Sequence, residues 1–398
     1  MAKGIMTSCP PAIVVKLDSI TGLDTARILS GYGIPVYGVA DDPGHYCVKT
    51  NSCREVLFTN TSGEGLVSDL LGLSRRFKSK PVLFPCSDES VRIISANRKA
   101  LREFYNFVLP DDDVLSMYMN KESFYKYAEE KGYHVPGTFF PEKKSDLETI
   151  LAEADLPYIV KPALKSGEWI ECFNDKVIKV NTRGELCDVF EKGSKITERM
   201  MVQKWIKGDD SKLFSCIFYY GRDGERKVSF VSRKLRQWYT ENGDACLAEE
   251  YMNAEVSDIT HDLLANTGFA GIGSIEYKLD EESGEYYIME ANVGRPVTRI
   301  ALTEAAGVPL LYTMYCDALG LPLPPNREQM YKGTKWISFH RDLQASWKYY
   351  RDGKLPFTEW LKSLYGVKSF AVLSLRDPKP FLALIRDGLT GLLKSSPK

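Results

Sequence analysis

Three oxygen-bearing side chains in the C-terminal half of the sequence, Glu276, Glu290 and Asn292, have types and a spacing that could hold a hard cation. Carboxylate and amide oxygens suit Mg²⁺, which keeps several waters and takes the rest of its shell from phosphates. Arg295 follows closely and could clamp an anion with paired hydrogen bonds. Together these four residues predict a site for metal-bound phosphate chemistry.

A β-hairpin must bring these residues together. Residues 273–280 alternate between apolar and polar side chains, which is typical of a strand. Residues 281–284 have the composition of a turn, and Tyr286 to Met289 is a returning strand. The hairpin alone does not decide the matter, because glutamates on an antiparallel pair commonly face solvent and Asn-x-Gly is ordinary turn material.

Three further segments have residue types that suit a bound nucleotide. Lys161 ends a predicted strand ahead of a short loop, 163–167, whose amides could cradle phosphates. Residues 203–206 could bond an adenine edge through their backbone, and a carboxylate in 208–210 could bind ribose hydroxyls. Residues 232–237 carry three cations, a natural anion receptor. Each segment alone is weak, because basic residues are more often solvated than functional.

The bulk composition is that of an ordinary globular protein of 398 residues, long enough for two or three domains. A net charge of -1 gives no support for nucleic-acid binding. The nine cysteines lack CxxC pairs and Cys/His ligand spacing, so neither zinc nor a disulfide framework is indicated. Free cysteines in this number suit a reducing cytosol.

Targeting signals and membrane spans are not evident in the sequence. No apolar run approaches the ~18–20 residues that a membrane helix needs, and the N-terminus lacks the pattern of a signal peptide. We therefore expect a cytoplasmic protein without a membrane span. Residues 380–393 have the spacing of an amphipathic helix, which we expect to pack on its own domain; docking on a membrane or a partner is the alternative.

The first 115 residues read as the start of a doubly wound α/β sheet. Ala12 to Leu17 and Ile34 to Val39 are apolar runs typical of strands, and Leu23 to Leu29 between them has helical spacing. A full G-x-G-x-x-G is absent after the first strand, which argues against a nicotinamide oxidoreductase.

Residues 116–320 mix strands and helices in the manner of an α+β domain with an antiparallel sheet. The expected strands are 158–162, 177–180, 200–208, 213–220 and 228–233. A proline-rich run, 321–325, marks the beginning of a C-terminal piece in which 336–339 and 370–375 read as strands.

The order of these pieces, from about residue 10 to about residue 320, resembles the ATP-grasp superfamily. The resemblance implies a Rossmann-like pre-ATP-grasp domain (1–115) and a two-lobed ATP-grasp domain (116–320) that holds ATP between antiparallel sheets. The small lobe is expected at about 121–200 and the large lobe at about 201–320. Residues 321–398 are then a C-terminal extension packing on the large lobe.

The resemblance also implies roles for individual residues. The phosphates of ATP are expected to be bound by Lys121 and Lys161, together with Lys165 and Ser166 of the short loop. The adenine is expected to be bound by Gln203, Lys204, Trp205 and Ile206, and the ribose by Asp210. Glu276, Glu290 and Asn292 match the Mg²⁺ ligands, and Arg295, Arg236 and Lys234 are the expected catalytic cations.

Within the superfamily the chain resembles carboxylate–amine ligases of the D-aspartate ligase type. The motifs that carry this likeness are Pro85–Glu89, Phe107–Asp111, Glu130–Pro136 at the end of the Lys121 helix, and Ser232–Gln237. Two departures stand out. The loop 163–167 is poorer in glycine than many phosphate loops of the family, and Arg295 follows Val-Gly where relatives often have Asn-Pro-Arg.

The implied reaction has two steps: a carboxylate attacks the γ-phosphate of ATP to give an acyl phosphate, and an amine then displaces phosphate to form an amide. Because the acyl phosphate is fragile in water, residues 163–167 and 239–244 are candidates for closing loops. The alternatives left open are a carboxylase-like enzyme that uses bicarbonate and a nucleotide-binding protein without catalysis. The expected partners are a small-molecule carboxylate and amine, not nucleic acid, and a homodimer stays open.

Overall fold

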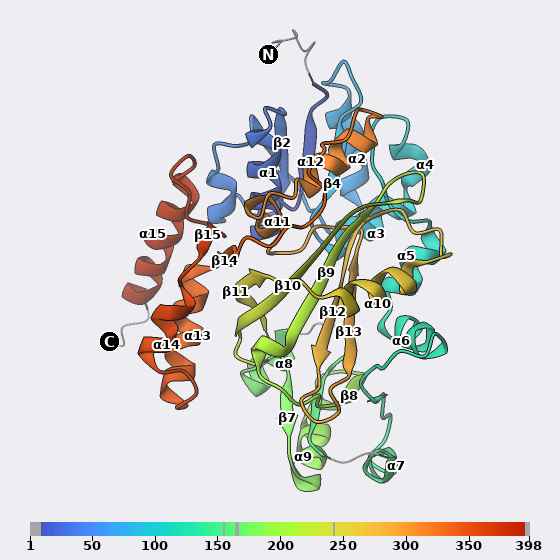
Figure 1. Cartoon of the computed structure of the whole chain (residues 1–398), viewed down its shortest axis with the longest axis vertical. Helices are drawn as coiled ribbons and strands as arrows, with labels where there is room; N and C mark the ends of the chain where they lie inside the picture. Colours follow the sequence, from blue (N-terminus) through green and yellow to red (C-terminus); the bar gives the residue numbers. More distant parts are fainter. Residues whose placement is uncertain (1–8, 154–155, 164–166, 242, 395–398) are drawn as a thin grey trace.

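Three β-sheets organise the chain in the computed structural model, which describes residues 9–153, 156–163, 167–241 and 243–394 (Figure 1). The nine cysteines are all free, as expected from their scattered spacing. No helix in the described ranges is long and apolar enough to cross a membrane.

The N-terminal sheet has four parallel strands in the order β3-β2-β1-β4. Its strands are β1 (Ala12–Val15), β2 (Val36–Ala40), β3 (Glu55–Phe58) and β4 (Val82–Pro85). The elements between and after them are α1 (Ile20–Gly31), the 3₁₀ turn η1 (Tyr46–Lys49), α2 (Gly65–Ser74), α3 (Asp88–Ala96) and α4 (Arg98–Leu101). Ser87 caps α3 by accepting from the Ser90 amide, so the chain turns sharply from β4 into the helix that begins with Asp88.

A second sheet is small and antiparallel, in the order β5-β8-β6-β7. Its strands are β5 (Thr138–Phe139), β6 (Tyr158–Pro162), β7 (Ile178–Val180) and β8 (Met200–Lys204), and its helices are α7 (Asp146–Glu153), α8 (Gly167–Phe173) and α9 (Arg183–Gly193). Two helices lead into it from the N-terminal sheet, α5 (Asp112–Met119) and α6 (Lys121–Glu130). Asn120 caps α6 by accepting from the Ser123 amide, which places Lys121 at its first position.

The third sheet has seven strands in the order β13-β12-β9-β10-β11-β14-β15, all antiparallel neighbours except β14 and β15. They are β9 (Leu213–Tyr220), β10 (Arg226–Trp238), β11 (Asp244–Glu250), β12 (Gly271–Leu279), β13 (Tyr286–Val293), β14 (Lys335–Ile337) and β15 (Val367–Phe370). The other elements are η2 (Asp210–Lys212), α10 (Ala254–Leu264), α11 (Ala301–Ala305), α12 (Leu310–Ala318), α13 (Phe339–Arg351), α14 (Phe357–Ser363) and α15 (Lys379–Lys394). β14 and β15 bring the C-terminal residues onto the edge of this sheet.

The cores show which parts fold together. Side chains from opposite faces of the N-terminal sheet, Val14 and Ile13, lie in two clusters that also contain large-sheet residues such as Ile217 and Ile275. The small sheet encloses a core of its own around Trp169. The N-terminal sheet and the large sheet are therefore packed as one body by apolar burial, and the small sheet is a distinct unit.

The predicted fold class is confirmed in its mixture of a parallel α/β sheet and largely antiparallel α+β sheets. Three strands differ most from expectation. β8 ends at Lys204 rather than at residue 208, and β10 continues to Trp238 rather than ending at residue 233. β15 ends at Phe370, where the predicted strand begins. The sequence pattern does not predict the full length of β10, because Lys234 and Arg236 are buried polar residues within the strand. They interrupt the alternation of apolar and polar residues that usually indicates a strand. The domain boundaries remain predictions.

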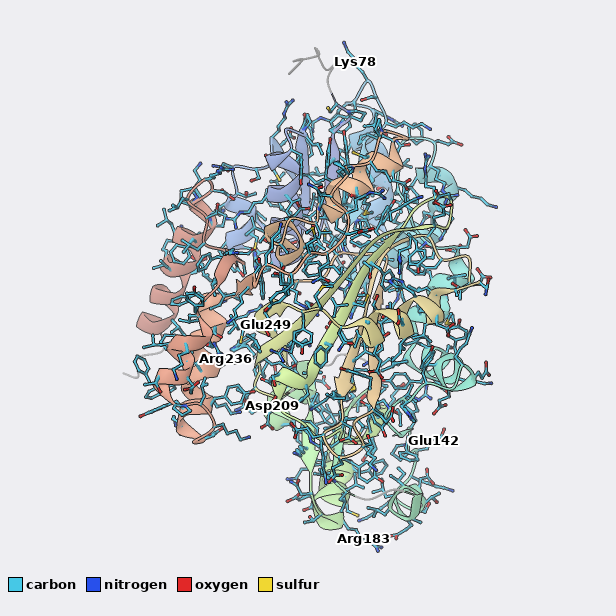
Figure 2. The ribbon with its side chains drawn as sticks, viewed as in Figure 1. Lys78, Glu142, Arg183, Asp209, Arg236 and Glu249 are labelled. Atoms are coloured by element: carbon cyan, nitrogen blue, oxygen red, sulfur yellow. The ribbon has the colours of Figure 1, made fainter. Side chains whose placement is uncertain are left out.

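A buried ion pair fixes α13 to the large sheet. The Arg236 Nε and a second guanidinium nitrogen donate to the two carboxylate oxygens of Asp342 at 2.8 and 3.2 Å. The Trp360 indole donates to the same carboxylate at 3.0 Å. Arg236, labelled in Figure 2, thus lies where β10 meets the C-terminal helices.

We expect Asp342→Ala to destabilise the protein by about 3–5 kcal/mol, because it leaves the buried Arg236 charge without a partner. Urea denaturation measures this. The double variant Arg236→Met/Asp342→Leu should recover most of the loss, and Asp352→Ala, at the exposed end of the same helix, should stay within about 0.5 kcal/mol of the parent. Equal effects of Asp342→Ala and Asp352→Ala would contradict this account.

Candidate active site

The predicted hairpin exists and sets the two glutamates opposite each other. In the register of β12 and β13, Glu276 pairs with Glu290 and Ser274 pairs with Asn292. Ile275 on the other face of β12 is completely buried in the core, so the alternation of the strand turns Glu276 the opposite way.

Glu276 is nearly buried and is held by two cations. The Lys234 Nζ lies 2.9 Å from its Oε2, and the Arg299 guanidinium donates to its Oε1 at 3.3 Å. Arg299 also donates to the hydroxyls of Ser215 and Ser232, from the neighbouring strands β9 and β10. Both cations are thus fixed on the sheet that carries the carboxylate.

Glu290 contacts a third cation. The Lys121 Nζ lies 3.3 Å from its Oε2, and the Asn292 amide donates to its Oε1 at 3.2 Å. Burial alone would raise the pKa of Glu290, but the charges of Lys121 and Lys234 and the Asn292 hydrogen bond outweigh burial and lower that pKa to about 2. Glu290 is therefore ionised at any physiological pH.

Lys161, the fourth cation, ends β6 of the small sheet beside Lys121. Burial and the positive charge of Lys121 together lower the pKa of Lys161 to about 7, although Glu290 acts to raise it. In contrast, the pKa of Lys121 is raised, since Glu290 outweighs the effect of burial. The two lysines thus share one carboxylate, and Lys161 is the one whose proton is loosely held.

The charges in this cluster do not balance. Among the described residues, four cations (Lys121, Lys161, Lys234 and Arg299) surround two carboxylates, an excess of two positive charges when Lys161 is protonated. Uncompensated buried charge is costly. A cluster that keeps such an excess is suited to an anion that carries at least two negative charges.

Arg295 connects this cluster to the N-terminal sheet. Its guanidinium forms a bidentate pair with Asp88 at 2.5 and 3.2 Å and donates to the Asn292 Oδ1 at 2.6 Å. The turn before it requires glycine, because Gly294 has φ of +80° and a Cβ would lie 2.7 Å from Val91. Gly294 therefore allows the backbone conformation from which Arg295 contacts Asp88.

The orientation of Gln203 is fixed by its neighbours. Its amide nitrogen donates to the Tyr125 hydroxyl at 3.1 Å and to the Thr138 hydroxyl at 2.8 Å. Both hydroxyls in turn donate to backbone carbonyls, those of Met289 and Pro136, so they must accept from Gln203. The amide oxygen of Gln203 is left as an acceptor.

The aromatic ring of Trp205 lies between two lysines. The ammonium groups of Lys179, from β7, and Lys278, from β12, lie 4.2 and 4.3 Å from its ring centre. Burial lowers the pKa of Lys278 to about 8, although Asp210 and Glu241 raise it. This contact joins the small and large sheets beside the hairpin.

Other predicted residues lie in different settings. The nearly buried Asp210 accepts from the Gln237 amide groups at 2.8 and 3.0 Å and from the Tyr349 hydroxyl at 2.5 Å. Lys204 is exposed, and Ile206 is buried. Lys165 and Ser166 lie outside the described residues.

Five of the six predicted metal and catalytic groups thus lie together around the hairpin, and one is apart from it. Lys234 and Arg295 contact Glu276 and Asn292, whereas the Arg236 guanidinium is paired with Asp342. In the predicted closing loop 239–244, Glu241 is attached to α13, because its backbone amide donates to the Tyr349 hydroxyl at 3.0 Å. The loop 163–167 is described only at its ends.

Sequence reasoning missed two members of the cluster. Arg299 lies outside every motif that was singled out, and only the fold brings it to Glu276. Asp88 stands in the Pro85–Glu89 motif, which contributes to the family likeness but indicates no partner for this carboxylate. No cluster of three His, Cys, Asp or Glu residues that could hold a metal occurs in the described ranges. A cation would therefore rely on two carboxylates and an amide oxygen.

Comparisons with known proteins find similarity in part of the sequence and in the fold. The family described as carbamoyl-phosphate synthase L chain, ATP binding domain, matches residues 246–326, which include the hairpin. The crystal structure of N5-carboxyaminoimidazole synthetase from Staphylococcus aureus complexed with ADP matches with a TM-score of 0.65, at 14% identity over 87% of each chain. The chain has an ATP-grasp fold.

Two proteins named as amino-acid ligases are also similar to this chain, one in sequence and one in fold. A D-aspartate ligase from Enterococcus faecium (strain Aus0004) is 25% identical over 226 residues, which are 54% of this chain and 53% of that protein. The chain thus matches about half the length of this curated relative. The L-amino acid ligase from Bacillus licheniformis matches with a TM-score of 0.57, at 12% identity over 79% of this chain and 75% of that one. The chain resembles ATP-grasp carboxylate–amine ligases.

Lysine titration tests the charge cluster directly. We expect Lys161 to titrate near pH 7, and Glu290→Gln to lower that pKa further, because it removes the negative charge that holds the proton. NMR of ¹³C-methylated lysines measures this, with Lys161→Arg to assign the resonance. Glu285→Gln, an exposed change near the hairpin turn, is the matched control. Titration of Lys161 above pH 10 would contradict the geometry.

Proposed function

We propose that the protein is an ATP-dependent carboxylate–amine ligase. The observation that carries this proposal is the excess of two positive charges around Glu276 and Glu290. Fully ionised ATP bound to one Mg²⁺ has a net charge of about -2, which matches the excess. The sequence match to a D-aspartate ligase supports amide formation as the reaction.

The adenine end of the nucleotide has donors and acceptors in suitable positions. The free amide oxygen of Gln203 would accept from the adenine amino group. The Trp205 amide already donates to the Pro157 carbonyl at 3.0 Å, whereas the Ile206 amide has no partner among the described residues and would donate to a ring nitrogen. Asp210 would use its remaining lone pair for a ribose hydroxyl.

The cluster of cations would bind the phosphates of the nucleotide. Lys121 and Lys161 would move from Glu290 to phosphate oxygens, because the nucleotide brings more negative charge than one carboxylate. We assign Lys165 and Ser166 to the same end from the family resemblance alone.

The residues of the hairpin fit a hard cation. Glu276, Glu290 and Asn292 offer only oxygen ligands, and their small number suits an ion that keeps waters and phosphate oxygens in its shell. When bound, Mg²⁺ would neutralise charge on the transferring phosphoryl group. Arg295 holds the Asn292 Oδ1 in place for this role.

The reaction then needs positioning more than covalent help from the protein. A carboxylate oxygen of the substrate attacks the γ-phosphorus, the bond to the β-phosphate oxygen breaks, and ADP leaves. An amine nitrogen attacks the acyl carbon, phosphate leaves, and the amine loses its proton. We propose Lys234 and Arg295 as the cations nearest the transferring group. Arg236, paired with Asp342, would shape the wall of the site.

A second candidate is an ATP-grasp enzyme with a different acceptor, such as bicarbonate. The structural similarity to N5-carboxyaminoimidazole synthetase supports this second candidate. The TM-score for that enzyme is 0.65, whereas the TM-score for the L-amino acid ligase is 0.57. The ligase remains the better supported function, because the amide-forming relative is similar in sequence as well.

Phosphate release from Mg·ATP tests the function. We expect release to require an amino acid or dicarboxylate and to rise when an amine is added, with a new amide in the mass spectrum. Glu290→Ala should lower the rate by at least 100-fold, because it removes the proposed metal ligand, whereas Glu285→Ala should leave the rate unchanged. Release that requires bicarbonate and no amine would favour the second candidate.

Nucleotide affinity should depend on pH through Lys161. Bound phosphates raise the pKa of Lys161 above its value of about 7 in the free protein, so binding takes up a proton. Affinity for ADP should therefore fall as pH rises above 7, by at most about tenfold per pH unit. Calorimetry from pH 6 to 9 measures this.

The matched control for this dependence is Lys161→Arg. A guanidinium stays protonated throughout the range, so any slope left in this variant belongs to the nucleotide itself. Identical slopes in the parent and in Lys161→Arg would refute the role of Lys161.

A further inference from the structure

The C-terminal elements expose an unusual amount of apolar surface. Twelve of the twenty exposed large hydrophobic side chains in the described residues lie between Phe339 and Ile385, about an eighth of the chain. They come from α13, α14, β15, α15 and the turns between them, on one flank of the molecule (Figure 1). We call this surface the C-terminal apolar face. Apolar patches of this extent mark a binding surface rather than ordinary scatter.

Helix α13 shows how the face is built. Its inner side carries Asp342 and Tyr349, which bind the residues of β10 and η2 described above. Leu343, Trp347 and Tyr350 are exposed and fall on one stripe, because a helix turns by about 100° per residue. Trp347 is 63% exposed. The helix is therefore anchored by polar contacts inside and is apolar outside, with nothing covering its outer stripe among the described residues.

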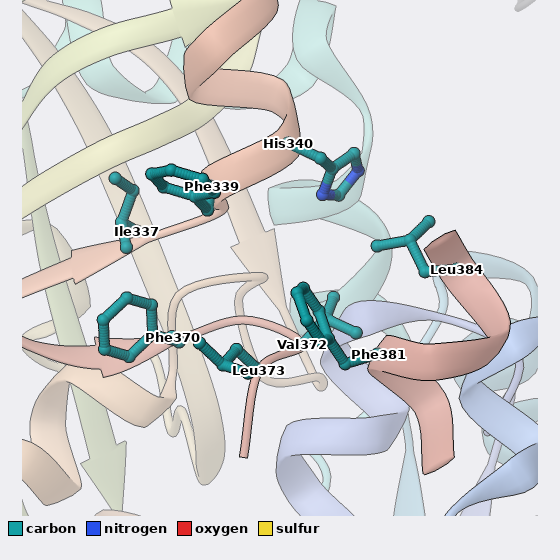
Figure 3. Close-up of a pocket in the computed structure, with 8 residues that line it drawn as sticks. All are labelled: Ile337, Phe339, His340, Phe370, Val372, Leu373, Phe381 and Leu384. Carbon is teal, nitrogen blue, oxygen red and sulfur yellow. The ribbon is translucent and has the colours of Figure 1, made fainter. Parts of the chain in front are cut away.

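A shallow groove connects α13 to α15. Figure 3 shows Phe339 and His340 of α13 on one side, Phe370 of β15 below, and Phe381 and Leu384 of α15 on the other side. Its cavity volume is about 10 Å³, too small for a drug-sized ligand. Burial lowers the pKa of His340 to about 4, so the groove is uncharged at neutral pH. The groove makes the face continuous rather than providing a pocket.

Exposed charges around the face are mostly positive. Between residues 339 and 388 there are eight exposed Lys and Arg side chains and three exposed Asp and Glu side chains, although the whole chain has a net charge of -1. The two other carboxylates of this stretch, Asp342 and Asp377, are buried in ion pairs with Arg236 and Arg27. The excess of about five positive charges is therefore presented outward.

We propose that the C-terminal apolar face docks on the surface of an anionic lipid bilayer. Exposed aromatic and aliphatic side chains beside cations are what an interfacial helix uses to enter the headgroup region. A second copy of the chain fits less well, because a two-fold contact would bring the same cations of both copies together. The proposal is independent of the ligase activity.

Vesicle flotation of the full chain tests this. The protein should float with vesicles of phosphatidylcholine and phosphatidylglycerol (7:3) and bind pure phosphatidylcholine at least tenfold more weakly. Trp347→Glu should lower the partition coefficient at least tenfold, since it places a charge in the apolar stripe. Met252→Glu, a similarly exposed apolar position away from the C-terminal elements, is the matched control and should bind as the parent does.

Charge reversal gives a second, independent variant. Lys348→Glu/Arg351→Glu leaves the apolar stripe intact and should weaken binding to the anionic vesicles at least tenfold, with circular dichroism unchanged. Absence of flotation with either vesicle would overturn the proposal. So would a dimer in analytical ultracentrifugation that Trp347→Glu dissociates, because the face would then be an interface between copies.

Discussion

The positive charge gathered around two glutamates is the constraint on which the architecture depends. Lys121 begins a helix, Lys161 ends a strand of the small sheet, Lys234 lies within β10, and Arg299 follows β13. Like charges this close repel one another, and the carboxylates of Glu276 and Glu290 are the negative charges that offset this repulsion among the described residues. The apolar cores beneath the sheets must supply the stability that this cluster costs.

Local patterns were enough to predict most elements, because they depend on neighbours in the sequence. The strand Leu213–Tyr220 occurs with the predicted bounds. The hairpin that faces Glu276 with Glu290 follows from alternation and a turn. Each of these features can be predicted from a stretch of about ten neighbouring residues.

Contacts between distant residues could not be predicted in this way. Arg236 appears in a basic run and reads as an anion receptor, yet its partner is Asp342, 106 residues away. Arg299 and Asp88 likewise gain their roles only when the sheets pack. A motif shows which charges a segment carries, but the folded chain decides which of them are neutralised and which remain available to a ligand.

The pair between Asp88 and Arg295 has a consequence for modularity. Asp88 begins a helix of the N-terminal sheet, and through Arg295 it fixes Asn292, near the end of β13. The part of the chain that carries the hairpin is therefore not an independent structural unit. A chimera in which the first 115 residues were replaced would keep the whole hairpin but would lose Asp88. Arg295 would then lack the carboxylate that orients it, unless the new N-terminal segment placed a carboxylate in the same position.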